Sequence, residues 1–322
     1  MFRRILTVAM LSVIAACSAI AGADETVPAL LAAGKVDEAI AQLHGQINTS
    51  PNDAVAHNLL CRAYFTLGDW DRGISSCEKA VSLAPDNSQF HLWLGRVYGE
   101  KADKAGMFSA ARLAGKVRDQ FEAAVKLNPN SVDARSDLAE FYLEAPGIVG
   151  GGRDKAEQQA DTLSALDPAR AHWVKARIAE KHKDLAAAER EYRAAIASSH
   201  GSASSWLNLG LFYRHRQRFD EMVEALRHVR SAPIDRADAM VDAAEILINA
   251  QRSFPEAIAL LKSYLNSNLR VEQAPVFKVH YLLGAAAEKM GDKQVATEEY
   301  RAALDLAREF QPARQALERI GR

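Results

Sequence analysis

Of the residues in this chain, His57 and Cys61 have the types and spacing most similar to a nucleophile paired with its general base. They are four residues apart, so in a helix both side chains lie on one face. A cysteine in contact with a histidine is the arrangement that activates a thiolate nucleophile. The sequence offers no third group to orient the histidine. We therefore expect no catalytic residue at this position, and no enzyme.

A glycine cluster at residues 146–154 has the spacing of a phosphate-binding loop without its chemistry. Gly147 and Gly152 are separated by four residues, as in the pattern G-x-x-x-x-G-K-[ST]. Arg153 and Asp154 stand where that pattern needs Lys and Ser or Thr. A glycine-rich segment before a helix can still bind an anion through backbone N–H groups. We expect an enlarged turn between two helices, with a ligand-binding or partner-binding loop as the alternative.

The nine histidines have no spacing that is typical of a metal site. The sequence contains neither the H-E-x-x-H motif nor paired cysteines at zinc-binding spacing, and the C-x-x-C-H motif of haem attachment is absent as well. We therefore expect no metal and no cofactor. The net charge of −1 gives no support for nucleic acid as a partner.

Residues 1–23 have the features of an export signal. Arg3 and Arg4 form a short basic start, an apolar run follows, and residues 21–23 fit the small-x-small rule for a cleavage site. The apolar run is too short to span a bilayer comfortably. We expect this signal to be removed, so that residues 24–322 form an exported, periplasmic protein. Loss of the two arginines changes the net charge from −1 to −3.

The same segment has a second interpretation. Residues 14–17 (Ile-Ala-Ala-Cys) are similar to the lipobox of bacterial lipoproteins, in which cleavage precedes a cysteine that carries the lipid. The Leu most common at the first position of that box is Ile14 here. In this alternative, residues 1–16 are the signal and Cys17 tethers the protein to a membrane. The sequence leaves both the soluble and the lipid-anchored form open.

The rest of the chain is organised by a recurring motif that contains an aromatic residue or His, then Leu-Gly, then Tyr. Copies begin at His91 and Trp206, and a third, which begins at His280, keeps the Leu-Gly step at Leu283 and Gly284. Prolines close successive units, because proline cannot continue the helix before it but leaves the chain free to begin another. The pattern resembles the tetratricopeptide repeat (TPR), whose consensus W-x2-L-G-x2-Y, A-x3-F, P recurs about every 34 residues. The closing prolines are Pro51, Pro85, Pro129 and Pro168.

The resemblance covers the chain after about residue 25 and implies an all-α fold. We expect one elongated array, a right-handed superhelix of about seven to eight helical hairpins. A last helix, at about residues 308–320, has its apolar residues on one side and is expected to cover the open end of the stack. The expected hairpins begin near Pro28, Ala54, Ser88, Val132, Ala169, Ser202, Asp235 and Ala274.

The resemblance also implies a disulfide between Cys61 and Cys77. Cys61 stands at the Gly of the Leu-Gly step, and Cys77 takes the place of an aromatic residue three positions before Ala80. In TPR hairpins these two places face each other where the helices approach most closely. An exported protein meets oxidising conditions in which such a pair can form. The alternative is two buried thiols that act as small apolar residues.

Carried over residue by residue, the resemblance implies a concave groove lined by the first helices of the hairpins. Arg62 and Arg96 make part of this wall basic, whereas Asp133, Glu140 and Glu144 make the next part acidic. An extended peptide of mixed charge would suit such a wall. The expected groove residues are Asn58, Arg62, Phe65, Leu92, Arg96, Ser136 and Glu140.

Residues 99–116 form a segment about ten residues longer than the repeat requires. Its middle carries Met107 and Phe108 beside a helix-breaking glycine. We expect these side chains to tuck under a lengthened hairpin, with an exposed contact patch as the alternative. The glycine cluster lies in the next repeat, so both segments can share one surface. The residues of this expected surface are Met107, Phe108, Gly147, Ile148, Val149 and Arg153.

These observations favour a non-enzymatic TPR scaffold of the bacterial cell envelope that binds a protein or peptide partner. One alternative is a lipoprotein accessory, tethered through Cys17, for envelope assembly or transport. A remote alternative is an enzyme that binds phosphate or a nucleotide with its glycine cluster. A repeat fold does not by itself dictate an activity, so the sequence leaves the partner open.

Overall fold

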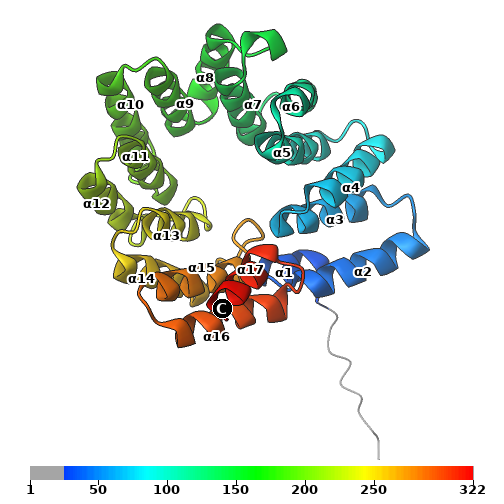
Figure 1. Ribbon diagram of the computed structural model, residues 1–322. Coiled ribbons are helices and arrows are strands. Elements are labelled where there is room, and N and C mark those ends of the chain that lie inside the picture. The colour runs from blue at the N-terminus through cyan, green and yellow to red at the C-terminus, as the bar shows by residue number, and fades with distance from the viewer. Residues whose placement is uncertain (1–24, 322) are drawn as a thin grey trace, which may run out of the picture.

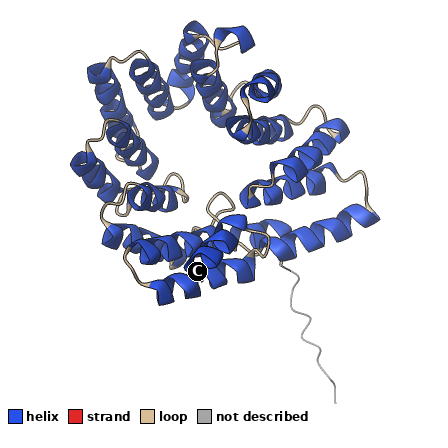
Figure 2. Cartoon of the chain, in the orientation of Figure 1, coloured by secondary structure: helices blue, strands red, loops and turns tan. Residues whose placement is uncertain are grey.

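The computed structural model describes residues 25–321, and over this part of the chain every regular element is a helix (Figure 2). Eight helical hairpins are followed by one last helix, which confirms the expected all-α repeat architecture. The hairpins begin within four residues of the expected positions. The pairs are α1 (Val27–Ala32) and α2 (Val36–Thr49), α3 (Ala54–Leu67) and α4 (Trp70–Leu83), α5 (Ser88–Lys104) and α6 (Met107–Leu127), α7 (Val132–Glu144) and α8 (Arg153–Leu166), α9 (Pro168–Lys181) and α10 (Leu185–Ser198), α11 (Ala203–His215) and α12 (Phe219–Val229), α13 (Ala239–Asn249) and α14 (Phe254–Leu265), and α15 (Val276–Lys289) and α16 (Lys293–Leu306), before α17 (Gln311–Ile320).

Capping side chains explain where many of these helices begin. The Asp53 carboxylate accepts a hydrogen bond from the backbone N–H of Ala56 at 3.0 Å, at the start of α3. Such a cap satisfies an N–H that has no partner inside the helix, and its loss costs about 1 kcal/mol. The same role is played by Asp69, Asn87, Ser131, Asp167, Asp184, Ser202 and Asp292.

The glycine of each Leu-Gly step lies where the two helices of a hairpin come closest. A Cβ atom at Gly284 would lie 2.7 Å from the ring of Tyr300, and one at Gly210 would lie 2.5 Å from the side chain of Leu226. The large side chain follows its glycine by 16 residues in both hairpins. The glycine is therefore required for close packing, because any larger residue would push the second helix away.

Cys61 and Cys77 occupy the same two places in the hairpin α3–α4. Both side chains are fully buried, and the structure places their Sγ atoms at bonding distance with the Cα atoms 5.2 Å apart. This Cα separation lies within the range of disulfides. A side chain larger than glycine at position 61 leaves no room for an aromatic ring at position 77, so two small sulfur side chains fill the space that Gly284 and Tyr300 fill elsewhere.

The array of hairpins curves until its two ends meet, so that the molecule is a closed ring rather than the elongated array that we expected (Figure 1). Leu30 and Leu31 of α1 share one apolar cluster with Phe277 of α15 and with Ala313 of α17. The small rotation between successive repeats accumulates along such arrays. Here it brings the apolar face of the first hairpin onto the last ones, and each end buries the other.

Polar contacts also join the two ends of the ring. The Arg308 guanidinium donates to the Asp37 carboxylate at 2.8 Å, and Arg72 of α4 forms an ion pair with Glu309. Helix α17 is present as expected and packs on α16, but this end of the array also contacts the N-terminal helices. The expectation that α17 covers an open end therefore needs this correction: the end that it helps to cover is closed by the start of the chain.

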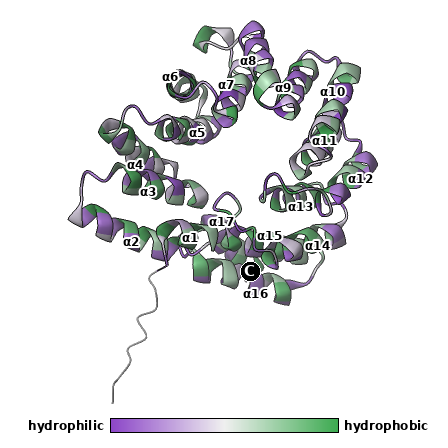
Figure 3. Ribbon diagram, turned by 180° about the vertical axis from the view of Figure 1, so that it is seen from behind, coloured by the Kyte–Doolittle hydropathy of each residue, from purple (hydrophilic) through white to green (hydrophobic). Residues whose placement is uncertain are grey.

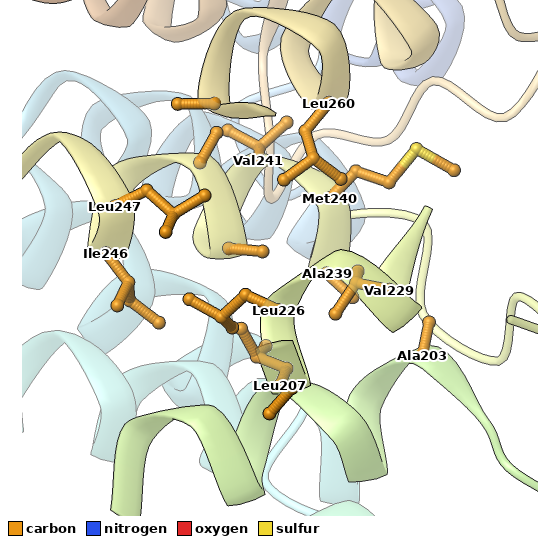
Figure 4. Close-up of a cluster of buried hydrophobic side chains, with 14 of the residues drawn as sticks. Ala203, Leu207, Leu226, Val229, Ala239, Met240, Val241, Ile246, Leu247 and Leu260 are labelled. Carbon is orange, nitrogen blue, oxygen red and sulfur yellow. The ribbon is translucent and has the colours of Figure 1, made fainter. Parts of the chain in front are cut away.

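The apolar core is distributed over the hairpins instead of forming one centre. Figure 3 shows apolar and polar residues on every hairpin of the ring. The largest cluster runs from α9 to α15, and Figure 4 shows Leu207, Leu226, Leu247 and Leu260 of four successive helices within it. Between residues 25 and 321 no helix has the length and apolar character needed to cross a bilayer. The expected signal segment and Cys17 lie outside the described residues.

Candidate functional site

The first helices of the hairpins line the inside of the ring, and two adjoining hollows there share part of their lining. One hollow, of about 500 Å³, lies between α3, α5 and α15, and the other, of about 600 Å³, extends along α3, α5, α7 and α9. Phe65 and Trp93 line both hollows. The connection between α12 and α13 also reaches the larger hollow, where Arg236 and Asp238 are part of its lining.

The charged side chains of this inner wall are largely paired with one another. The Arg96 Nε donates to the Asp137 carboxylate at 2.6 Å, and the Arg177 Nη2 donates to Glu140 at 2.8 Å. Burial raises the pKa of the Asp137 carboxyl, and the charge of Arg96 opposes this rise without cancelling it. Most of the expected change from a basic to an acidic wall is thus neutralised within the protein, although Asp133 lines the larger hollow with no ion pair among the described residues. A charged peptide would have to compete with these internal pairs.

The structure brings only some of the expected groove residues to the inner wall. Phe65, Arg96 and Ser136 line the hollows, although the Ser136 hydroxyl is committed to the backbone oxygen of Val132. Leu92 is buried in the core, because the first helices of adjacent hairpins pack against each other on its face of α5. Its neighbour Trp93 lies at the hollow instead. Had the inward face of this helix been assigned one residue later, the sequence would have predicted Trp93 at the wall.

Asn58, Arg62 and Glu140 complete the expected set, and none of them is free at the wall. Asn58 is 3% exposed, and its amide nitrogen has no hydrogen-bond partner among the described residues. Arg62 is bound to Glu272, which comes from a different part of the chain, and Glu140 is bound to Arg177. Sequence reasoning missed Glu272 because the repeat pattern assigns no inward-facing role to the connections between hairpins.

A third hollow, of about 480 Å³, lies on the outside of the ring between the hairpin α5–α6 and the turn η1 (Gly147–Val149). The long insertion extends both helices of this hairpin, to 17 and 21 residues. We call this hollow the outer groove. The charged residues in its lining are Asp103 and Glu144. The remaining lining consists of Gly99, Ala102, Met107, Ala110, Ala111, Ala114, Val117, Phe141, Ala145, Pro146, Ile148 and Val149.

Met107 and Ile148 of the outer groove are exposed, and so is Phe108, which follows Met107 in α6 but is not part of the groove lining. Met107 is 79% exposed, Phe108 89% and Ile148 95%. The prediction that Met107 and Phe108 tuck under the hairpin is therefore wrong. They lie in the first turn of α6, which extends beyond the neighbouring hairpins and so finds nothing to pack against. Arg153 turns away from this surface, since its guanidinium donates to Glu157 of α8 at 2.7 Å.

The glycine cluster is a closed turn in which the three consecutive glycines have already used their backbone donors. The N–H groups of Gly150, Gly151 and Gly152 donate to the backbone oxygens of Gly147, Pro146 and Tyr142. A Cβ atom at Gly151 would lie 1.8 Å from the backbone oxygen of Ala145, so only glycine fits there. This geometry agrees with an enlarged turn, and it leaves these three N–H groups unavailable to a phosphate.

The structure gives His57 and Cys61 roles in packing and hydrogen bonding, not in catalysis. The His57 ring is hydrogen-bonded to the backbone oxygen of Pro51 at 3.0 Å, and Cys61 is fully buried against Cys77. A buried sulfur that is bonded to another sulfur cannot attack a substrate. Within residues 25–321 there is no group of three or more His, Cys, Asp or Glu side chains that could hold a metal ion.

Comparison with known protein families agrees with this architecture. One tetratricopeptide repeat model matches residues 25–88, 59–111 and 175–235, and a second matches residues 277–310. Together these matches cover more than half of the chain. The protein therefore belongs to the tetratricopeptide repeat family, whose repeats support a role as a scaffold for protein–protein interaction. A search of curated proteins found no match.

A solved structure shows a similar fold at low sequence identity. Yeast Tom70 is 15% identical, with a TM-score of 0.53 over 89% of this chain. The chain spans 58% of the length of Tom70. A thermophilic TPR protein of Thermus thermophilus, TTC0263, is 18% identical over 61% of this chain and 94% of its own, with a TM-score of 0.46. At these identities the likeness concerns the fold alone.

Proposed function

We propose that this protein is a non-enzymatic scaffold of the bacterial cell envelope that binds a partner protein in the outer groove. The observation that carries this proposal is the exposure of Met107 and Ile148, two large apolar residues that line one hollow. Soluble proteins rarely leave several large apolar side chains exposed together unless a partner covers them. The insertion that builds the groove is also what distinguishes this chain from a plain array of repeats.

The lining indicates what the partner presents to the groove. An apolar segment fits the alanines and the large side chains at its edges, and a basic residue beside that segment would face Asp103 and Glu144. Glu144 is already bound to Arg177 at 3.1 Å and to Lys181 at 2.5 Å, so Asp103 is the carboxylate that such a residue would meet. The proposed ligand is therefore an amphipathic helix with a Lys or Arg next to its apolar face.

Replacing Met107 or Ile148 with serine is expected to weaken partner binding at least about tenfold, because burial of one large apolar side chain contributes about 1.5–3 kcal/mol. Both side chains are largely exposed, so the fold should be unaffected. A partner captured from an envelope extract would be titrated against each variant. Val55→Ser, at an exposed apolar residue of α3, is the matched control. Equal binding by Ile148→Ser and the unmodified protein would contradict the proposal, as would equal losses in Ile148→Ser and Val55→Ser.

The envelope location rests on the sequence of residues 1–23, for which we propose cleavage by the general export machinery. The intact mass of the protein from native envelopes is expected to correspond to a chain that begins at Asp24. A mass that matches a chain beginning at a lipidated Cys17 would establish the tethered lipoprotein accessory instead. Retention of Met1 in the native protein would contradict both forms of the proposal.

The glycine cluster gives the enzyme alternative little support. A phosphate loop needs backbone N–H groups that point at the ligand, and here those of Gly150, Gly151 and Gly152 are bound within the turn. The Lys155 ammonium also donates to the backbone oxygen of Gly150 at 2.9 Å, which fixes the turn against α8. We propose a structural role for this segment, which is to hold Ile148 at the edge of the outer groove.

A further inference from the structure

The connection between α14 and α15, residues 266–275, reaches into the ring and contacts α3, from which it is far removed in sequence (Figure 1). We call this connection the strap. Its Glu272 is 8% exposed, and the Arg62 guanidinium binds the carboxylate with two nitrogens. Nε donates to Oε1 at 2.7 Å, and Nη2 donates to Oε2. Such bidentate binding is stronger and more specific in its geometry than a single hydrogen bond between a guanidinium and a carboxylate.

Arg62 is held in place by an aromatic platform. Its guanidinium carbon lies 5.2 Å from the ring centre of Trp93, and the Arg96 guanidinium lies at the same distance from that ring. Phe65 packs edge-on against Trp93 with 5.5 Å between the ring centres. Stacking on an aromatic face orients a guanidinium and leaves its N–H groups available to a carboxylate. We call Arg62, Phe65 and Trp93 the acid subsite.

The strap stands between the two inner hollows. Gln273 lines both of them, Val271 lines the larger one, and Phe65 and Trp93 of the acid subsite line both. Without the strap the two hollows would join over the acid subsite into one longer groove along α3 and α5. The strap therefore occupies the part of the inner wall that a ligand would need.

The backbone of the strap is anchored on both sides of Glu272. The Tyr264 hydroxyl accepts from the N–H of Val271 at 3.0 Å and donates to the backbone oxygen of Ala274 at 2.8 Å. These bonds connect the strap to α14 and not to α3. The Arg62–Glu272 ion pair joins the strap to α3, and rotation of the Glu272 side chain would release the Arg62 guanidinium to another carboxylate while the strap backbone and the helices stay in place.

We propose that the strap is an internal ligand, in which Glu272 occupies the place of an acidic side chain of a partner protein. A partner segment with a suitably placed Glu or Asp would replace Glu272 on Arg62, so the charge pair broken within the protein is formed again with the ligand. Binding is weakened by the fraction of molecules in which the strap still covers the site. This second site lies inside the ring, and its existence does not depend on the outer groove.

The test uses the strap's own sequence as the probe, because its carboxylate is known to fit. A fluorescent peptide of residues 267–275 (Ser-Asn-Leu-Arg-Val-Glu-Gln-Ala-Pro) is titrated by anisotropy against the unmodified protein and against Glu272→Gln. The variant is expected to bind the peptide at least about tenfold more tightly, since its strap no longer competes for Arg62. A peptide with Gln in place of its Glu should bind neither protein.

Three variants separate this proposal from a structural role of the ion pair. Glu272→Ala should bind the peptide as Glu272→Gln does, and Arg62→Gln combined with Glu272→Gln should abolish binding. Asp37→Asn breaks a different ion pair between the ends of the ring and should behave as the unmodified protein does. The proposal is overturned if neither Glu272 variant gains affinity, if the Glu and Gln peptides bind equally, or if binding persists without Arg62. Circular dichroism melting of each variant establishes that it is folded.

Discussion

Alanine at Gly34 is expected to separate the two ends of the ring and to lower the free energy of unfolding by about 3 kcal/mol. Gly34 lies between α1 and α2 with φ of +75°, a conformation that costs an L-residue about 1–2 kcal/mol. The added Cβ would also lie 2.6 Å from the backbone nitrogen of Val276. A backbone atom at the start of α15 cannot move aside as a flexible side chain can. The contact between the ends must therefore open.

Gly291→Ala is the matched control for this experiment. Gly291 has φ of +87°, and a Cβ there would meet no atom within 4 Å, so its substitution carries the cost of the backbone conformation alone. Urea unfolding should show a loss of about 1 kcal/mol for the control, well below that of Gly34→Ala. Small-angle scattering should show a larger radius of gyration for Gly34→Ala only. Equal losses of stability, with no expansion of Gly34→Ala, would mean that the ends are not held together as the structure shows.

Closure of the ring connects the two proposed sites to different parts of the fold. The outer groove is built by α5, α6 and η1, which lie away from the junction of the ends. The acid subsite lies near that junction, because Glu272 precedes α15 and Arg62 belongs to α3. Opening of the ends should thus affect the strap and leave the outer groove intact. Binding at the two sites can therefore be measured separately in one protein.

The sequence predicts the hairpins well because their signals are local. Asp53, Asn87 and Ser131 cap the helices that the repeat places after the closing prolines. The Leu-Gly step predicts the close approach of two helices, which the contacts of Gly210 and Gly284 show directly. Each of these signals acts over one or two helical turns, so no distant residue is needed to interpret it.

The ring closure could not be predicted from such signals. It depends on the sum of many small rotations between hairpins, and nothing beside Gly34 in the sequence points to Val276 as its neighbour. The prediction of the inner-wall residues was partly wrong for a related reason. Leu92 and Trp93 are adjacent, so an error of one residue in the assumed helical face exchanges a core residue for one at the hollow. The exposure of Phe108 depends on how far α6 extends beyond its neighbours, which is again a property of the assembled array.

Loss of a disulfide between Cys61 and Cys77 is expected to lower the free energy of unfolding by about 3 kcal/mol, the value for a closed loop of about 15 residues in the chain-entropy model. The two residues are separated by 16 positions and are fully buried in the hairpin α3–α4. Reductant should therefore shift the urea midpoint of the unmodified protein and leave a Cys61→Ala, Cys77→Ala double variant unchanged. Peptide mapping without reductant measures the bond itself. Free thiols in the native exported protein, with no effect of reductant, would show that the pair acts only as two small side chains.

The other hairpins supply a sharper form of the same experiment. Gly284 with Tyr300, and Gly210 with Leu226, fill the space that the two sulfurs fill between α3 and α4. Cys61→Gly combined with Cys77→Leu restores that pairing without a covalent bond, and its buried apolar area should offset part of the loss. We expect this variant to be more stable than the double alanine variant, less stable than the oxidised protein, and insensitive to reductant. If it is no more stable than the double alanine variant, the pairing of these two positions does not follow the packing rule of the other repeats.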